Sequence, residues 1–150
     1  MRLSFAFFLS LIALAVCDTA NCGGANYTPR HLQKAVSAAC SLLQERKTVG
    51  RNEYPHKYQN HEKIELTGPP PYFEFPLLPY GEIYSGDAPG PDRVIITKDC
   101  KLAGAITHTG SSRNGFVTCD VKRSPASVLV LNGQSVFALC FTMMLYAAVA

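Results

Sequence analysis

Residues 54–62 read Y-P-H-K-Y-Q-N-H-E and mark the point where the character of the chain changes. Before them the apolar residues follow a helical period, and after them glycine and proline separate short apolar pieces. The stretch holds two histidines, two tyrosines, two amides and an acid in nine residues. If its first half is extended, Tyr54, His56 and Tyr58 share one face, because alternate side chains of a strand do. This composition is typical of a functional site rather than of a core strand.

The segment before this stretch predicts one helix. Thr28 and Pro29 supply an N-cap side chain and a proline at the first helical position. From Arg30 to about Glu45 the apolar residues recur at helical spacing, and Cys40 lies near the same face. The apolar positions are Leu32, Val36, Ala39, Leu42 and Leu43. One side of this helix is therefore suited to packing.

The segment after Gly50 predicts short strands. Turn signals at residues 68–71, 86–91 and 110–115 separate apolar or aromatic pieces. These pieces are residues 54–58, 72–78, 93–97, 102–108 and 114–118. The pattern predicts an α+β domain in which one N-terminal helix lies on an antiparallel sheet.

The N-terminal segment predicts a secretory signal peptide. Arg2 precedes an apolar run over residues 3–16, and small residues follow near its end. We expect residues 1–17 to be removed, with cleavage between residues 15 and 20. A structural helix is the alternative.

The C-terminal residues 121–150 predict a linker and a hydrophobic tail. No residue of Ser124–Ala150 is charged, and residues 136–150 form an apolar end. Small residues, a spacer and an apolar tail outline a GPI-anchor signal, although Pro125 and the apolar residues 128–131 depart from that pattern. A tail-inserted membrane helix and a nonfunctional extension are the alternatives, but fifteen apolar residues are short for a full span. We expect a secreted protein. If the tail acts as an anchor signal, the protein would be attached to the cell surface.

Residues 21–120 remain as one small domain. Secretion implies an oxidising compartment, so its four cysteines predict disulfides, for which three pairings are open. They are Cys22, Cys40, Cys100 and Cys119. The tripeptide Asn26, Tyr27, Thr28 is a glycosylation sequon.

Several function classes find no support in the domain. No glycine-rich phosphate loop precedes a helix, and no C-x-x-C pair has a matching histidine spacing, so we expect neither a nucleotide cofactor nor zinc. The formal net charge of +3 over 150 residues is modest for a nucleic-acid binder and does not discriminate.

Five polar residues indicate a catalytic site only when they are considered as a set. Taken singly, Glu74 and Arg93 are expected at the surface of their strands, and His108 could be a polar strand end. With Tyr54 and His56 they supply a carboxylate, two imidazoles, a guanidinium and a phenol on different short strands. An acid, a base and a fixed cation are what phosphoryl transfer on RNA requires.

Four segments of the chain resemble the small fungal guanyl-specific ribonucleases. The resemblance runs from about residue 22 to residue 119, with the motifs in the same order. The segments are Y-P-H-K-Y-Q-N-H-E, P-Y-F-E-F-P, Y-S-G-D-A-P-G-P-D-R-V-I and G-A-I-T-H-T-G-S-S-R-N-G-F-V-T-C. The resemblance implies a twisted antiparallel sheet, the disulfides Cys22–Cys119 and Cys40–Cys100, cis bonds before Pro55 and Pro71, and no cofactor.

The resemblance also implies catalytic roles. Glu74 would be the general base, assisted by His56, and His108 the general acid. Arg93 and Tyr54 would contact the scissile phosphate, against which Phe116 would pack. Single-stranded RNA would then be cleaved after guanosine through a 2′,3′-cyclic phosphate, by a monomer and without action on DNA.

Base recognition is where the chain departs from the family pattern. Tyr58, Gln59, Asn60, His61 and Glu62 stand where the family reads Tyr-Asn-Asn-Tyr-Glu. Glu62 would accept the N1–H and N2–H₂ groups of guanine, and Tyr58 would stack on the base. His61 replaces the second tyrosine, so we expect retained guanine preference with a higher KM.

A second departure lies near Asn114, whose backbone carbonyl would face the base. Its neighbour is Arg113, where the family favours a small residue.

Two other functions compete with the ribonuclease. One is a ribonuclease-fold effector that binds RNA or a partner protein without cleaving, but a binding module does not need a paired acid and base. The other is a disulfide-linked structural domain of the cell surface, favoured only by the tail.

Overall fold

The computed structural model describes the backbone of residues 16–125, and within it a compact unit formed by Asp18–Arg123. The predicted tail and residues 1–15 of the predicted signal peptide lie outside the described residues. No helix within residues 16–125 is long and apolar enough to cross a membrane.

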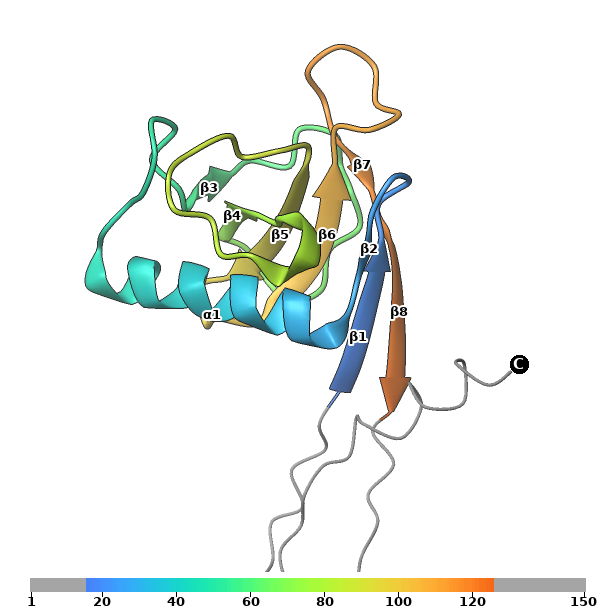
Figure 1. The fold of residues 1–150 in the computed structure, drawn as a ribbon, viewed down its shortest axis with the longest axis horizontal. Helices are drawn as coiled ribbons and strands as arrows, with labels where there is room; N and C mark the ends of the chain where they lie inside the picture. Colours follow the sequence, from blue (N-terminus) through green and yellow to red (C-terminus); the bar gives the residue numbers. More distant parts are fainter. Residues whose placement is uncertain (1–15, 126–150) are drawn as a thin grey trace, which may run out of the picture. The chain divides into compact units, whose positions relative to one another are not determined.

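A five-stranded antiparallel sheet is the centre of this unit (Figure 1). Its strands follow in the order β3, β4, β5, β6, β7. Their bounds are His56–Tyr58, Tyr72–Pro76, Asp92–Thr97, Leu102–Thr107 and Val117–Thr118. The predicted strand over residues 54–58 begins only at His56, because Pro55 has no N–H to contribute to the ladder.

One helix, α1 (Pro29–Glu45), crosses this sheet, as the sequence predicts (Figure 1). Thr28 is its N-cap and accepts a hydrogen bond from the backbone N–H of His31, while Pro29 occupies the first turn. A short 3₁₀ turn, η1 (Pro79–Gly81), packs against the helix. The α+β class predicted from sequence is confirmed.

A second sheet of three strands was not expected from the sequence. Its order is β2 (Asn26–Tyr27), β1 (Val16–Asn21), β8 (Asp120–Pro125). In β1 and β2, Ala20 pairs with Tyr27. These segments are short or lie in stretches that composition assigns to the signal peptide and the linker.

The sheet is apolar on both faces. The helix buries Leu32, Val36 and Ala39 in a cluster that includes Val94 and Ile96 of β5. Ile95, between them in sequence, belongs to a second cluster with Tyr58 and other residues under the segment after β3. Because side chains alternate along a strand, this second cluster marks the face of the sheet away from α1.

Both disulfides implied by the family resemblance are present. Cys22 is bonded to Cys119 and Cys40 to Cys100. The peptide bonds before Pro55 and Pro71 are cis, also as expected.

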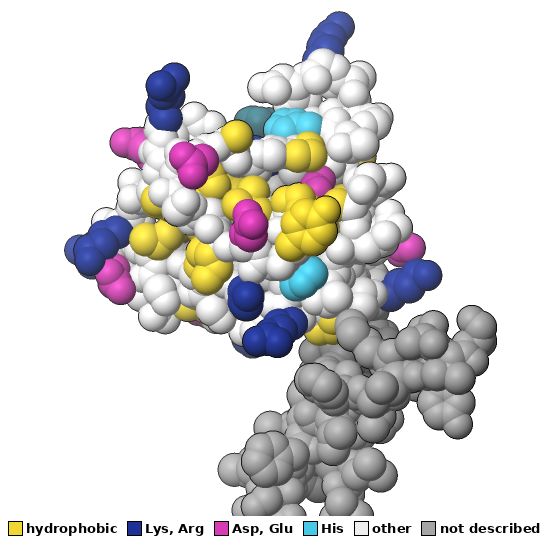
Figure 2. Space-filling view, viewed as in Figure 1, with side chains coloured by type: hydrophobic (Ala, Val, Ile, Leu, Met, Phe, Trp, Pro, Cys, Tyr) yellow, Lys and Arg dark blue, Asp and Glu magenta, His cyan; other side chains and the backbone are white. Residues whose placement is uncertain are grey.

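Figure 2 shows hydrophobic side chains across the face that carries α1 and η1. Tyr80 and Ile83 are among the exposed large hydrophobic residues. A shallow groove of about 380 Å³ runs along the helix between Arg30, Lys34 and Ile83. Its lining contains none of the predicted site residues.

Candidate active site

Strand register brings four of the predicted catalytic residues to one face of the five-stranded sheet. His56 of β3 lies opposite Glu74 of β4, which lies opposite Ile95 of β5. Arg93 is two positions before Ile95 and therefore shares its face, which is the face away from α1. His108 directly follows β6, two positions after Ile106 of the same cluster. His56, Glu74 and Arg93 are thus held on strands of the sheet.

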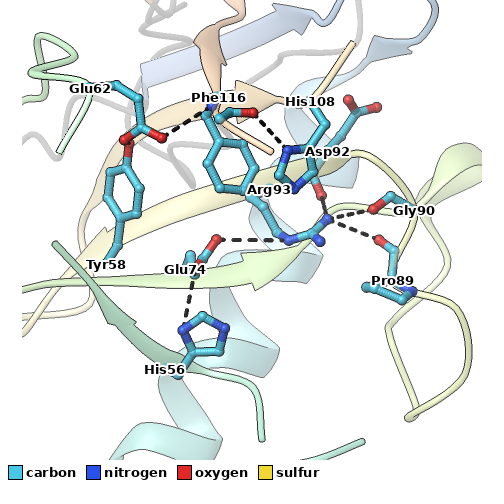
Figure 3. Close-up of polar contacts among 11 residues, drawn as sticks. His56, Tyr58, Glu62, Glu74, Pro89, Gly90, Asp92, Arg93, His108 and Phe116 are labelled. Atoms are coloured by element: carbon cyan, nitrogen blue, oxygen red, sulfur yellow. Dashed lines mark hydrogen bonds and ion pairs between the residues drawn. The ribbon is translucent and has the colours of Figure 1, made fainter. Parts of the chain in front are cut away.

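Glu74 and His56 form the first pair of the site (Figure 3). The Nδ1 atom of His56 is 3.3 Å from Oε1 of Glu74. The Tyr54 ring stacks on the imidazole at 4.7 Å between centroids. Glu74 is only 6% exposed, so the prediction of a surface position drawn from its strand alone is wrong. The Glu74 side chain is buried, whereas that of His56 is half-exposed.

Arg93 is buried as well, against the usual expectation for an arginine at a strand end. Its Nη1 donates to the backbone carbonyls of Pro89, Gly90 and Asp92 at 3.1, 2.8 and 2.8 Å. Its Nε lies 3.8 Å from Oε2 of Glu74, too far for a hydrogen bond. The guanidinium is therefore fixed through Nη1, while its buried Nε lies beside Glu74 without a hydrogen-bond partner among the described residues.

Burial and charge act in opposite directions on Glu74. Desolvation raises the pKa of this carboxyl, and the nearby His56, Arg93 and His108 partly offset that rise. The net pKa is above the ordinary value of 4.5. A carboxylate that is costly to keep ionised is a stronger base than an exposed glutamate, as a general base requires.

His108 is held by the segment that follows it. Its Nδ1 lies 2.8 Å from the carbonyl oxygen of Gly115, and its ring stacks on Phe116 at 3.9 Å. With Nδ1–H donating to that carbonyl, Nε2 is the nitrogen left for proton transfer. Arg93 lies 5.3 Å from the Tyr54 ring and 5.9 Å from the Phe116 ring, so two aromatic rings flank the cation.

The loop after β3 surrounds Glu62. The Tyr58 hydroxyl donates to Oε2 of Glu62 at 3.1 Å, and the backbone N–H of Phe116 donates to Oε1 at 3.2 Å (Figure 3). Partial burial opposes ionisation of Glu62, but these bonds, its own backbone N–H and the nearby His61 outweigh it and lower its pKa. Glu62 is thus an exposed carboxylate, ionised at neutral pH, with both oxygens already engaged.

Asn60 shapes this loop rather than offering its side chain to a ligand. Its backbone is left-handed, with φ of 52°, a conformation that asparagine tolerates well. Its amide accepts from the N–H of Ile64 and donates to the carbonyl of Ile64, each at 2.8 Å. Its backbone N–H therefore remains the group suited to a base.

The remaining predicted base-binding residues differ in exposure. Gln59, His61 and Asn114 are exposed, and no side-chain hydrogen bond of theirs is found within residues 16–125. Tyr58 is only 7% exposed. Little of the Tyr58 ring is therefore open to stacking on a base in this structure.

Comparisons with known proteins identify the family of this chain. The model of a family described as ribonuclease matches residues 15–120. The chain belongs to the ribonuclease family. The guanyl-specific ribonuclease T1 of Aspergillus oryzae is 42% identical over 119 residues, which cover 79% of this chain and 91% of that protein. The guanyl-specific ribonuclease Th1 of Trichoderma harzianum is 45% identical over 103 residues, covering 68% and 97%.

A solved structure is similar too. The ribonuclease He1 from Hericium erinaceus is 32% identical with a TM-score of 0.50, covering 68% of this chain and 98% of that one. The RNA-cleaving activity predicted from the sequence is supported by these findings, and a non-cleaving binding protein is not favoured.

Sequence reasoning missed the backbone groups of this candidate site. The carbonyls of Pro89 and Gly90 hold Arg93, and the Gly115–Phe116 peptide contacts both His108 and Glu62. The only sequence signal was the turn chemistry of residues 86–91 and 110–115, which does not say where a carbonyl points.

Proposed function

We propose that this ribonuclease cleaves single-stranded RNA on the 3′ side of guanosine, with Glu74 and His108 as base and acid. The main support for this proposal is the buried Glu74 carboxylate, which lies between His56 and the guanidinium of Arg93. A carboxyl of raised pKa next to a fixed cation supports the proposal of a base beside a phosphate-binding guanidinium.

The first step is a transphosphorylation. Glu74, assisted by His56, takes the proton of the 2′-hydroxyl, and the 2′-oxygen attacks phosphorus. The N–H groups of Arg93 and the Tyr54 hydroxyl stabilise charge on the phosphate oxygens, while Phe116 packs beside them. Nε2 of His108 protonates the departing 5′-oxygen, which leaves a 2′,3′-cyclic phosphate.

The second step is hydrolysis with the roles exchanged. His108 removes a proton from water, and protonated Glu74 returns a proton to the 2′-oxygen as the ring opens. The product is a 3′-phosphate. All proton transfers use side chains of this chain, and the proposal includes no metal or organic cofactor.

A dinucleotide assay tests this function. The protein should cleave GpC faster than ApC, CpC and UpC and release a cyclic phosphate first. Equal rates after all four bases would reject the base preference, and absence of cleavage would reject the enzyme.

The pH dependence of kcat/KM should be bell-shaped. Glu74 has to be ionised and His108 protonated in the free enzyme. Because burial raises the pKa of Glu74, activity should be lost on acidification at a pH above that of an ordinary glutamate, 4.5. Initial rates of GpC cleavage from pH 3 to 9 check this, and an acidic limb at or below 4.5 would contradict it.

His61 should limit affinity for the base. His61 is exposed and offers a smaller stacking surface than tyrosine. We expect His61→Tyr to lower KM for GpC by about 5-fold or more, since a base–aromatic stack contributes about 1–3 kcal/mol. An unchanged KM would mean that position 61 does not contact the base. Lys63→Ala is the control, because Lys63 is exposed in the same loop.

The secretory route adds three proposals. We expect residues 1–17 to be removed, Asn26 to carry a glycan and the tail to direct attachment to the cell surface. Asn26 is exposed, and its sequon threonine, Thr28, caps α1. Supporting secretion, a 45% identical relative from Gibberella baccata is named an extracellular ribonuclease.

Mass spectrometry of the protein from its own host tests all three proposals at once. The N-terminus, a glycosidase-sensitive mass at Asn26 and the C-terminus are read separately. Retention on membranes after treatment with a phosphatidylinositol-specific phospholipase would count against the anchor, and sedimentation of the same sample checks the expected monomer.

A further inference from the structure

One peptide group connects the two halves of the site. The carbonyl oxygen of Gly115 lies 2.8 Å from Nδ1 of His108, and the N–H of the same amide, on Phe116, donates to Oε1 of Glu62 at 3.2 Å (Figure 3). The amide is planar, so its carbonyl and its N–H cannot turn independently. A displacement of Glu62 that turns this peptide also moves the acceptor that holds His108.

The side chains around this peptide reinforce the connection. The Phe116 ring stacks on His108, and its edge meets the ring of Tyr58 at 6.0 Å. The Tyr58 hydroxyl donates to the other oxygen of Glu62. Ser111 also donates its hydroxyl to the Gly115 carbonyl at 2.5 Å. The base-reading carboxylate and the imidazole therefore share two sets of contacts, one polar and one aromatic.

The charge on Glu62 adds to this geometry. An anion at the N–H end of an amide polarises it, which makes the carbonyl at the other end a better acceptor. A better acceptor favours the Nδ1–H form of the imidazole and a protonated ring. The contact between Glu62 and the peptide thus influences both the orientation of the His108 ring and its protonation.

We propose that Glu62 has a second role as a positioning residue: through the Gly115–Phe116 peptide it holds His108 ready to protonate the leaving oxygen. The proposal rests on the function proposed above and couples reading of the base to proton delivery. A carboxylate has about four acceptor positions, so Glu62 can bind guanine while it keeps the Phe116 N–H. Guanine would then fix Glu62, and with it the acid, more firmly than any other base.

The test uses a substrate whose base cannot engage Glu62. Adenine has no N1–H and no N2 amine, so ApC cleavage reports the acid without base reading. We expect Glu62→Ala to lower kcat for ApC about 10-fold, because misplacing a catalytic group by about 1 Å can cost up to 100-fold. Glu62→Gln keeps an acceptor oxygen for the Phe116 N–H, so it should recover most of that loss. Both variants should lose most of the preference for GpC over ApC.

A pH profile separates positioning from a general structural effect. The alkaline limb of kcat for ApC should move to lower pH in Glu62→Ala, because the protonated imidazole loses support. The other charged groups near His108 are Glu74 on β4 and Arg93 on β5, with His56 on β3 next to Glu74, and all three stay in place in each variant.

Glu65→Ala is the matched control, since Glu65 is an exposed acid of the same loop. It should leave the ApC rate and its pH profile unchanged. The proposal is wrong if Glu62→Ala cleaves ApC at the wild-type rate with an unmoved limb, or if the alanine and glutamine variants lose the same rate. Failure of the wild-type protein to cleave GpC would instead reject the function on which the proposal rests. Because Glu62 is exposed, both variants should fold, and equal urea midpoints verify this.

Discussion

Glu74→Gln should lower kcat/KM for GpC by about 10²–10⁴-fold, the usual contribution of a general base. Glutamine keeps the size of the side chain and an oxygen or nitrogen facing Nδ1 of His56, but it cannot take the 2′-hydroxyl proton. His108→Ala should cause a loss of the same order by removing the acid. Initial-rate kinetics at pH 6 on both variants measure this. Cleavage within about 5-fold of wild type in both variants would remove Glu74 and His108 from the mechanism.

The same Glu74→Gln variant should be more stable than the wild type at pH 7. Burial raises the pKa of Glu74 in the native state, whereas the unfolded chain ionises at about the ordinary 4.5. The free energy of unfolding of the wild type therefore falls as the pH rises from 4.5 to the raised pKa of Glu74 in the native state. The glutamine variant has no carboxyl at this position, so it avoids this loss. In urea unfolding, the free energies of unfolding of the variant and the wild type should differ little at pH 3.5 and more at pH 7.

Glu65→Gln provides the control for both measurements, since it removes one exposed carboxylate from a neighbouring loop. It should change neither the rate nor the stability difference between the two pH values. A Glu74→Gln variant that is less stable than wild type at pH 7 would contradict an unfavourable burial of this charge.

Removal of the Cys22–Cys119 disulfide should have the largest effect on stability. The bridge spans 97 residues, so the chain-entropy model gives a loss of about 4–5 kcal/mol in the free energy of unfolding. Small domains have about 5–15 kcal/mol in total, so the serine pair at these positions should be unfolded to a measurable extent at 37 °C. Urea denaturation at 25 °C measures the loss.

The serine pair at Cys40 and Cys100 is the comparison for this experiment. That bridge spans 60 residues, and both of its cysteines are partly exposed, whereas Cys22 and Cys119 are buried. We expect a smaller loss there, because only the first pair also places hydroxyls in the core. A loss below about 2 kcal/mol for Cys22 and Cys119 would contradict the entropy estimate.

The helix and the central strands could be predicted from local patterns. Thr28 and Pro29 start the helix where the sequence indicates, and the apolar spacing identifies the face that packs. Turns rich in glycine and proline separate the apolar segments and so indicate where the strands of the five-stranded sheet lie. The second sheet could not be predicted, because β1 and β8 lie in segments whose composition indicates other roles and β2 has two residues.

The candidate site could also be predicted from the sequence only in part. Its residue types and order point to an acid, a base and a cation, but they do not show that Glu74 and Arg93 are buried. Burial depends on register across three strands, which places Glu74 opposite both His56 and Ile95. The contacts of the Gly115–Phe116 peptide depend on backbone direction in a loop, which side-chain chemistry does not encode.

The chemistry of the RNA ends tests the central claim most directly. Structured and unstructured RNA is incubated with the protein in a chelator, and the 3′ ends of the products are sequenced with separate capture of 2′,3′-cyclic phosphates. We expect ends at guanosine in single-stranded regions, first cyclic and later as 3′-phosphates, and almost none with Glu74→Gln. Ends carrying a 3′-hydroxyl, or ends spread evenly over the four bases, would contradict a guanyl-specific ribonuclease built on Glu74 and His108.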